Sequence, residues 1–151
     1  MSRTIGIAAA QLGPIHLADT RAQVVKRLLA LLEEAHAAGC RLVVFPELAL
    51  TTFFPRWWTE DQAVVDAYFE TEMPGPETQP LFDRAKELGM GFYLGYAELT
   101  EEAGVAKHYN TSILVAPDGN LIGKYRKIHL PGHSEHLPKA PFQHLEKKYF
   151  D

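Results

Sequence analysis

Cysteine is nearly absent from this sequence. Cys40 is the one cysteine in 151 residues, so the chain forms no internal disulfide, and a reducing, cytoplasmic location is expected. Long hydrophobic runs are absent as well, since every apolar stretch falls well short of the roughly 18 residues that a membrane span requires. The first residues are not a charged segment followed by a long apolar one. We therefore expect neither a signal peptide nor a membrane-spanning segment.

Positive charge is also limited. The 15 lysines and arginines are outnumbered by 19 aspartates and glutamates, which gives a net charge of −4. A nucleic-acid partner would need a basic surface, so none is expected. A glycine-rich phosphate loop is missing too, because Gly89, Gly91 and Gly95 do not have the spacing of such a motif. A nucleotide-binding α/β domain is therefore the weakest functional hypothesis.

The remaining sequence is typical of a globular α/β domain. Hydrophobic residues make up 46% and charged residues 23% of the chain, which argues against disorder. Helical periodicity predicts a long helix from Asp19 or Thr20 to Gly39, a short one opened by a Thr59–Gln62 capping box, and a third over 79–88. Apolar runs and turn residues predict strands at residues 4–11, 41–45, 91–99, 108–115 and 121–125. We expect a mixed sheet with helices on one face, a parallel crossover between the first two strands and a hairpin between the last two.

Two short segments place opposite charges at the ends of predicted strands. Glu47 ends the strand that runs through Val44-Phe45-Pro46, and Lys127 ends the strand at residues 121–125. Binding sites in open α/β sheets form at the carboxyl ends of strands, and the leucines that follow Glu47 should bury its carboxylate and raise its pKa. A carboxylate and an ammonium that share a cleft can act as general base and oxyanion stabiliser for a nucleophile.

Both residues also have a simpler explanation. Glu47 would then be a solvated glutamate at a strand end, and Lys127 would belong with Lys124 and Arg126 to a solvated or phosphate-binding basic segment. Side chains alternate along a strand, so Tyr125 and Lys127 share one face while Lys124 and Arg126 share the other. The alternation sets Lys127 apart from its basic neighbours and favours an inward position for it.

The nucleophile that such a pair requires is not evident in the chain. Cys40 begins the strand that Glu47 follows, which separates the two residues by roughly 20 Å. A buried thiol in that position is expected to act as a small hydrophobic residue. Thr111 and Ser112 lie within a strand and have no obvious histidine partner.

Histidines gather near the end of the chain. No cysteine accompanies them and no confident helix carries a pair of them, so no metal site is expected. Hydrogen bonds to a substrate or to Glu146 explain them better. Residues 132–151 show little periodicity and are predicted to be a functional loop rather than a core element. The histidines concerned are His129, His133, His136 and His144.

Several of these segments resemble a known family. Phe45-Pro46-Glu47 and the string KYRKIHL at residues 124–130 resemble the first two of three motifs of the nitrilase (carbon–nitrogen hydrolase) superfamily. The strings ELALTTFFPRW (residues 47–57), EMPGP (72–76) and PFQHLE (141–146) are more specific and resemble N-carbamoyl-D-amino acid amidohydrolases. The resemblance implies an α/β fold, the α-β-β-α four-layer sandwich of the nitrilase type. It also implies that residues 1–151 are the amino-terminal portion of a single such domain, truncated before the nucleophile motif.

The resemblance implies roles for individual residues. The superfamily uses a Glu-Lys-Cys triad, in which Glu47 would be the general base and Lys127 would stabilise the tetrahedral intermediate. Glu146 resembles the auxiliary catalytic glutamate, and His129 and His144 resemble substrate-contacting histidines. The nucleophilic cysteine, and the arginines that hold a substrate carboxylate, would lie beyond residue 151.

The implied reaction is hydrolysis of an N-carbamoyl-D-amino acid to the D-amino acid, CO2 and ammonia, without metal or organic cofactor. The intact protein is expected to be a homo-oligomer, and residues 1–151 alone are expected to be inactive. One alternative is another nitrilase-family amidase, acting on N-carbamoyl-β-alanine or N-carbamoylputrescine. Another is a non-catalytic interaction module that kept the half-fold.

Overall fold

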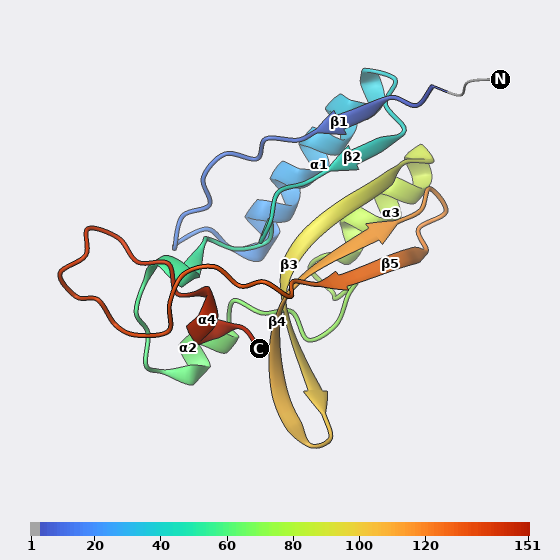
Figure 1. The fold of residues 1–151 in the computed structure, drawn as a ribbon. Helices are drawn as coiled ribbons and strands as arrows, with labels where there is room; N and C mark the ends of the chain where they lie inside the picture. The colour runs from blue at the N-terminus through green and yellow to red at the C-terminus, as the bar shows by residue number, and fades with distance from the viewer. Residues whose placement is uncertain (1–3) are drawn as a thin grey trace.

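A single five-stranded sheet organises the computed structural model, which describes residues 4–151 (Figure 1). The strands lie in the order of the sequence, and β1, β2 and β3 are parallel while β3, β4 and β5 are antiparallel. The mixed sheet predicted from the sequence is therefore confirmed. The strands are β1 (Ile7–Ala9), β2 (Leu42–Val44), β3 (Gly91–Glu102), β4 (Val105–Val115) and β5 (Leu121–Arg126).

Two helices cover one face of the sheet and lie behind it in Figure 1. They are α1 (Arg21–Ala37) and α3 (Gln79–Leu88). Thr20 caps α1 through a capping box with Gln23, and α3 ends at Gly89 in the left-handed conformation, as the sequence predicts. Apolar side chains from both helices pack on the sheet and form the main core, which includes Val24, Leu28, Leu32, Leu81, Phe82, Val43, Phe92, Leu94 and Ile113. Residues 4–151 thus supply one sheet layer and one helix layer of the four that a sandwich requires.

Short elements surround one end of the sheet. They are the 3-10 helix η1 (Phe54–Arg56), α2 (Gln62–Asp66) and α4 (Glu146–Tyr149). The predicted Thr59–Gln62 capping box is wrong, because the Asp61 side chain accepts from the Ala63 N–H and caps α2 instead. The backbone N–H of Thr59 donates to the Tyr149 hydroxyl, so Thr59 is held by a contact distant in sequence.

A second core lies between these short elements. Its buried members include Phe54 from η1, Val65 from α2 and Tyr149 from α4. The prediction that residues 132–151 contribute no core element is therefore wrong for their last part, where α4 is anchored. The segment lacked a visible apolar period because α4 is only one turn long.

The predicted strands end at residue 99 and resume at residue 108, which leaves the polar segment at residues 101–106 outside the sheet. In the structure, most of this segment continues the β3–β4 hairpin, and the chain reverses at Ala103 and Gly104, which both have positive φ.

None of the helices within residues 4–151 is long and apolar enough to cross a bilayer.

Candidate functional site

Three charged side chains meet beyond the ends of β2 and β5. The Lys127 Nζ donates to Glu47 Oε1 at 2.7 Å and to Glu146 Oε2 at 2.8 Å. The Glu47 side chain is 51% exposed, whereas that of Glu146 is 2% exposed. One ammonium is therefore held between an accessible carboxylate and a buried one.

The position of Glu47 depends on a close approach between two backbones. The Ala49 N–H donates to the Gly95 carbonyl at 2.8 Å, which ties the segment after β2 to β3. A Cβ at Gly95 would lie 2.9 Å from the Cα of Glu47, so glycine is required there. Leu48, the next residue, has a φ of 48°, and this turn directs the chain away from β2 immediately after the carboxylate.

Alternation along β5 separates Lys127 from its basic neighbours, as predicted. Lys124 and Arg126 both form ion pairs with Glu98, and the Arg126 Nε lies 2.9 Å from Glu98 Oε2. Lys127 points to the opposite face, where it meets Glu47. The positive charges of Lys124 and Arg126 are thus neutralised away from the site.

Glu146 reaches the site because α4 is anchored to the aromatic loop at residues 51–58. The Leu145 N–H donates to the Pro55 carbonyl at 2.8 Å, and the Tyr149 hydroxyl donates to the Trp57 carbonyl at 2.7 Å. These bonds fix the start and the end of α4. The buried carboxylate between them is oriented toward Lys127.

Asn110 on β4 is a site residue that the sequence reasoning missed. Its side-chain Nδ2 donates to Glu47 Oε1 at 2.6 Å and lies 3.4 Å from Glu146 Oε2. Its backbone carbonyl accepts from the Lys127 N–H at 2.8 Å. Asparagine is depleted in strands, so an asparagine within a predicted buried strand was the available signal.

Hydrogen bonding rather than burial decides the charge state of the pair. Burial alone would raise the pKa of Glu47, but hydrogen bonds from Lys127 and Asn110 outweigh it and lower the pKa. The sequence-based expectation of a raised pKa is therefore wrong. Burial opposes the charge of Lys127, yet its bonds to Glu146 and Glu47 raise its pKa. Both groups are held in their ionised forms.

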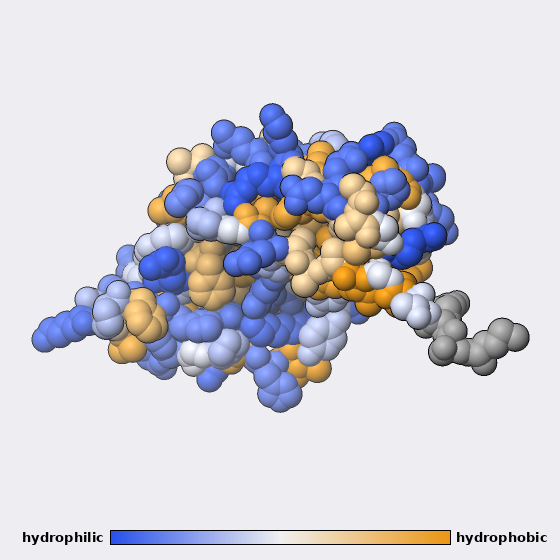
Figure 2. All heavy atoms as spheres, turned by 90° about the horizontal axis from the view of Figure 1, so that it is seen from above, coloured by the Kyte–Doolittle hydropathy of each residue, from blue (hydrophilic) through white to orange (hydrophobic). Residues whose placement is uncertain are grey.

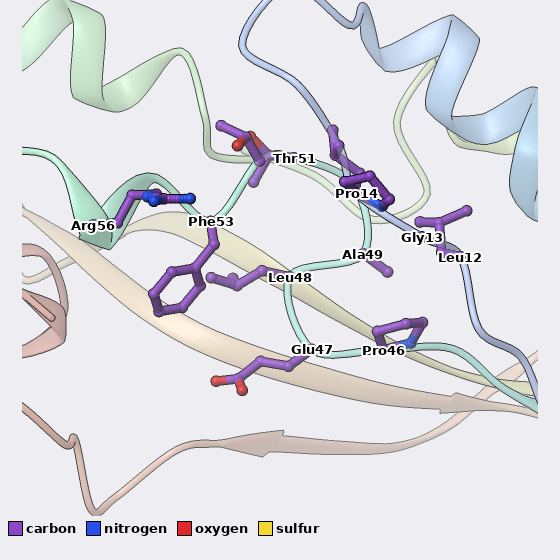
Figure 3. A pocket seen from close by; sticks show the side chains of 12 residues that line it. Leu12, Gly13, Pro14, Pro46, Glu47, Leu48, Ala49, Thr51, Phe53 and Arg56 are labelled. Atoms are coloured by element: carbon purple, nitrogen blue, oxygen red, sulfur yellow. The ribbon is translucent and has the colours of Figure 1, made fainter. Parts of the chain in front are cut away.

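Two hollows adjoin Glu47. One, of about 230 Å³, lies between the Glu47, Asn110 and Lys127 side chains and the exposed face of the sheet. The other, of about 270 Å³, lies between residues 12–15 and the segment at residues 46–56, and Figure 3 shows Glu47 at its edge with Phe53 and Arg56 across from Pro14. The first hollow is lined by Glu47, Tyr93, Gly95, Asn110, Thr111, Ser112, Tyr125 and Lys127.

The predicted histidines are not all near the three charged side chains of Glu47, Lys127 and Glu146. His144 Nε2 donates to Glu146 Oε1 at 2.9 Å, and its ring packs edge-on against Phe53 with centroids 5.4 Å apart. His129 is exposed, and its role as a substrate contact stays a prediction. His136 stacks on Trp58. Within residues 4–151, no three His, Cys, Asp or Glu side chains are grouped so that they could hold a metal ion.

Cys40 lies away from the cluster. It lines a separate hollow with residues 36, 39, 41 and 88–90, at the start of β2, whereas Glu47 follows the end of that strand. The structure therefore keeps this thiol apart from Glu47 and Lys127, as the sequence predicts.

The sequence is similar to proteins of one hydrolase family. Residues 6–151 match the family model described as carbon-nitrogen hydrolase. A formamidase from Bacillus cereus (strain G9842) is 28% identical over 120 residues, which cover 76% of this chain and 34% of that protein. Omega-amidase NIT2 from Homo sapiens is 31% identical over 116 residues, which cover 77% of this chain and 38% of that protein. The chain thus spans little more than a third of the length of these relatives.

Solved structures show the same fold. A carbon-nitrogen hydrolase from Helicobacter pylori G27 superimposes with a TM-score of 0.72 at 22% identity, covering 97% of this chain and 44% of that one. This likeness confirms the α/β fold class, and the family match spans nearly the whole chain. The formamidase and the omega-amidase are both amidases by name, and the chain belongs to the carbon-nitrogen hydrolase (nitrilase) family.

Proposed function

We propose that Glu47, Lys127 and Glu146 are the base, the oxyanion-stabilising group and the auxiliary carboxylate of a cysteine-dependent amidohydrolase. The observation that carries the proposal is the position of the Lys127 ammonium, 2.7 Å from Glu47 and 2.8 Å from Glu146. The accessible Glu47 is available to a proton donor. The buried Glu146 keeps the ammonium in place when Glu47 is protonated during the reaction.

The nucleophile in this proposal is a cysteine outside residues 1–151. Cys40 is at the wrong end of β2, and a ureido or amide carbonyl is a poor electrophile that needs a thiolate. The first hollow beside Glu47 has room for the reacting group. A thiol reaching it from another segment would complete the triad.

In the proposed reaction, Glu47 accepts a proton and then returns it in each of the two halves. As the sulfur attacks the carbamoyl carbon, Glu47 takes the thiol proton and the Lys127 ammonium stabilises the negative charge on the oxygen. The bond from carbon to the amino-acid nitrogen breaks, the departing amine takes the proton from Glu47, and a carbamoyl thioester remains. Glu47 then deprotonates a water, which releases carbamic acid and the thiol, and carbamic acid decomposes to CO2 and ammonia.

The proposed substrate is an N-carbamoyl-D-amino acid. The strings at residues 47–57, 72–76 and 141–146 support this choice, and the first and the last contain Glu47 and Glu146. The relatives named formamidase and omega-amidase favour a second candidate, hydrolysis of a simple carboxamide by the same residues. We further propose that the intact protein is a cytoplasmic homo-oligomer, as the low cysteine content and the family resemblance indicate.

The test uses the protein expressed from its complete reading frame. Ammonia release is measured with N-carbamoyl-D- and L-amino acids, N-carbamoyl-β-alanine and simple amides. We expect release from the D-carbamoyl substrates, and Glu47→Gln or Lys127→Ala should lower kcat by about 10³-fold or more.

Matched controls separate catalysis from folding. Glu34→Gln and Lys139→Ala make the same chemical changes at exposed positions and should leave kcat unchanged. Circular dichroism should show that all four variants are folded. Full activity in Glu47→Gln or Lys127→Ala would contradict the assigned roles, and hydrolysis of simple amides alone would favour the second candidate.

A further inference from the structure

We propose that Asn110 is a positioning residue for this site, an inference that rests on the proposed function. Its side-chain amide holds Glu47 and Glu146 at fixed positions around Lys127. It thereby reserves one oxygen of Glu47, Oε2, for the proton of the nucleophile.

The contacts form a closed arrangement of two donors and two acceptors. The Lys127 Nζ and the Asn110 Nδ2 both donate to Glu47 Oε1, at 2.7 and 2.6 Å. The same two nitrogens lie 2.8 and 3.4 Å from Glu146 Oε2. An amide NH2 carries two hydrogens, so Asn110 can bridge both carboxylates without carrying charge.

The bridging divides the two oxygens of Glu47 between different tasks. Oε1 accepts both protein hydrogen bonds, and within residues 4–151 no donor contacts Oε2. A carboxylate that accepts a proton on Oε2 can keep its bonds to Lys127 and Asn110 on Oε1. The geometry therefore provides a base that transfers a proton without breaking the contacts that orient it.

Asn110 is well placed to hold this arrangement. It is 5% exposed and lies within β4, and its backbone carbonyl accepts from the Lys127 N–H at 2.8 Å. One residue thus fixes both the backbone of Lys127 and the carboxylates that Lys127 contacts. Loss of the side chain would leave the backbone contact in place and remove the bridge alone.

The pH dependence of Glu47 is the readout that a merely structural residue would not change. Asn110 stabilises the charged form of Glu47 by hydrogen bonding, so its loss should raise the pKa of the base. The base acts only when deprotonated. As the pH falls, the variant should therefore lose activity at a higher pH than the unaltered protein does. The other titratable or charged groups around Glu47 are Lys127, Glu146, His144, Tyr93 and Tyr125, with Arg56 in the second hollow.

The experiment measures kcat and kcat/KM against pH for Asn110→Leu and Asn110→Asp in the full-length protein. Leucine removes the donors at similar volume, and aspartate also adds a third carboxylate. We expect kcat at neutral pH to fall roughly tenfold or more, with the acidic limb displaced to higher pH and displaced further by aspartate. Asn120→Asp in the exposed turn between β4 and β5 is the control and should leave the profile unchanged.

The outcomes are distinct. If the unaltered protein hydrolyses no carbamoyl or amide substrate, the proposed function fails. If it is active and the variants lose kcat equally at every pH, or lose nothing, only the role of Asn110 is overturned.

A measurement on the unaltered protein covers the case in which both variants fail to fold. The side-chain amide signal of Asn110 in a ¹⁵N–¹H spectrum should move with pH in step with the loss of activity, because its acceptor becomes protonated. An amide signal that stays constant through that transition would overturn the proposal.

Discussion

The basic side chains on the two faces of β5 form ion pairs with different glutamates. Arg126 and Lys124 are tied to Glu98 on one face, and Lys127 is tied to Glu47 on the other. Burial alone would raise the pKa of Glu98, but hydrogen bonds from Arg126, Lys124 and Thr111 lower it to about 2. Glu98 therefore stays charged and anchors β5 from behind the site.

The first prediction concerns this anchor. Glu98→Gln should lower the free energy of unfolding at pH 7 by roughly 2–3 kcal/mol, because charged hydrogen bonds are lost and two cations are left without their buried partner. The folded-state pKa lies below the ordinary value of 4.5, so the stabilisation is present above about pH 4.5 and is lost as the pH falls toward 2. Urea unfolding of Glu98→Gln and of the unaltered protein, at pH 7 and at a pH near 2, checks this prediction.

Glu102 provides the control for Glu98, because it pairs with the same arginine. Glu102 pairs with Arg126 at 2.6 Å but its side chain is 45% exposed. Glu102→Gln should cost clearly less stability than Glu98→Gln, since solvent screens exposed ion pairs. Equal losses in the two variants, or a loss in Glu98→Gln that is the same at low and neutral pH, would contradict the prediction.

At the scale of elements, the carboxylate depends on how closely β3 approaches the segment after β2. In Gly95→Ala the new methyl would meet the Cα of Glu47 at 2.9 Å and the Pro46 carbonyl at 3.0 Å, and both are backbone atoms. We expect kcat to fall by about 10²-fold from misplacement of the base, and stability to fall by roughly 1–3 kcal/mol.

The matched change for this variant is Gly123→Ala on β5. Its added methyl would lie 3.6 Å from the Leu114 Cβ, an ordinary contact, so activity and stability should be nearly unchanged. Thermal unfolding and steady-state kinetics measure both variants. Wild-type kinetics in Gly95→Ala would show that the close approach does not position Glu47.

How much could be predicted also differs between elements. The strands and the helices α1 and α3 carry local signals, namely apolar periods, the Thr20 cap and the glycine at residue 89, and these were predictable. α4 has four residues and forms where it contacts residues 54–57, which lie about 90 positions earlier, so no local pattern reveals it. In the site, Glu47 and Lys127 stood out as charges at strand ends. Asn110 did not, because its partners lie 63 and 36 residues away.

At the scale of the molecule, the sheet face opposite α1 and α3 exposes apolar side chains. It contributes a hollow of about 440 Å³ whose lining includes Ile5, Leu42, Leu114 and Ile122. Ile5 and Ile122 are 55% and 62% exposed. Figure 2 shows that apolar side chains gather in one area of the molecule seen from above, among hydrophilic neighbours. β1 and β5 are moreover the two open edges of the sheet.

An open apolar face and unpaired edges favour association. The last prediction is that residues 1–151 produced alone self-associate at micromolar concentration, and that Ile5→Lys with Ile122→Lys shifts the chain toward monomer by placing charges on this face. Val64→Lys is the control, because Val64 is also exposed, at 47%, but lies on α2 among the short elements. Sedimentation velocity distinguishes the three proteins. If unaltered residues 1–151 are monomeric, or if Val64→Lys shifts the chain toward monomer as much as the double variant does, then this face does not need a covering layer.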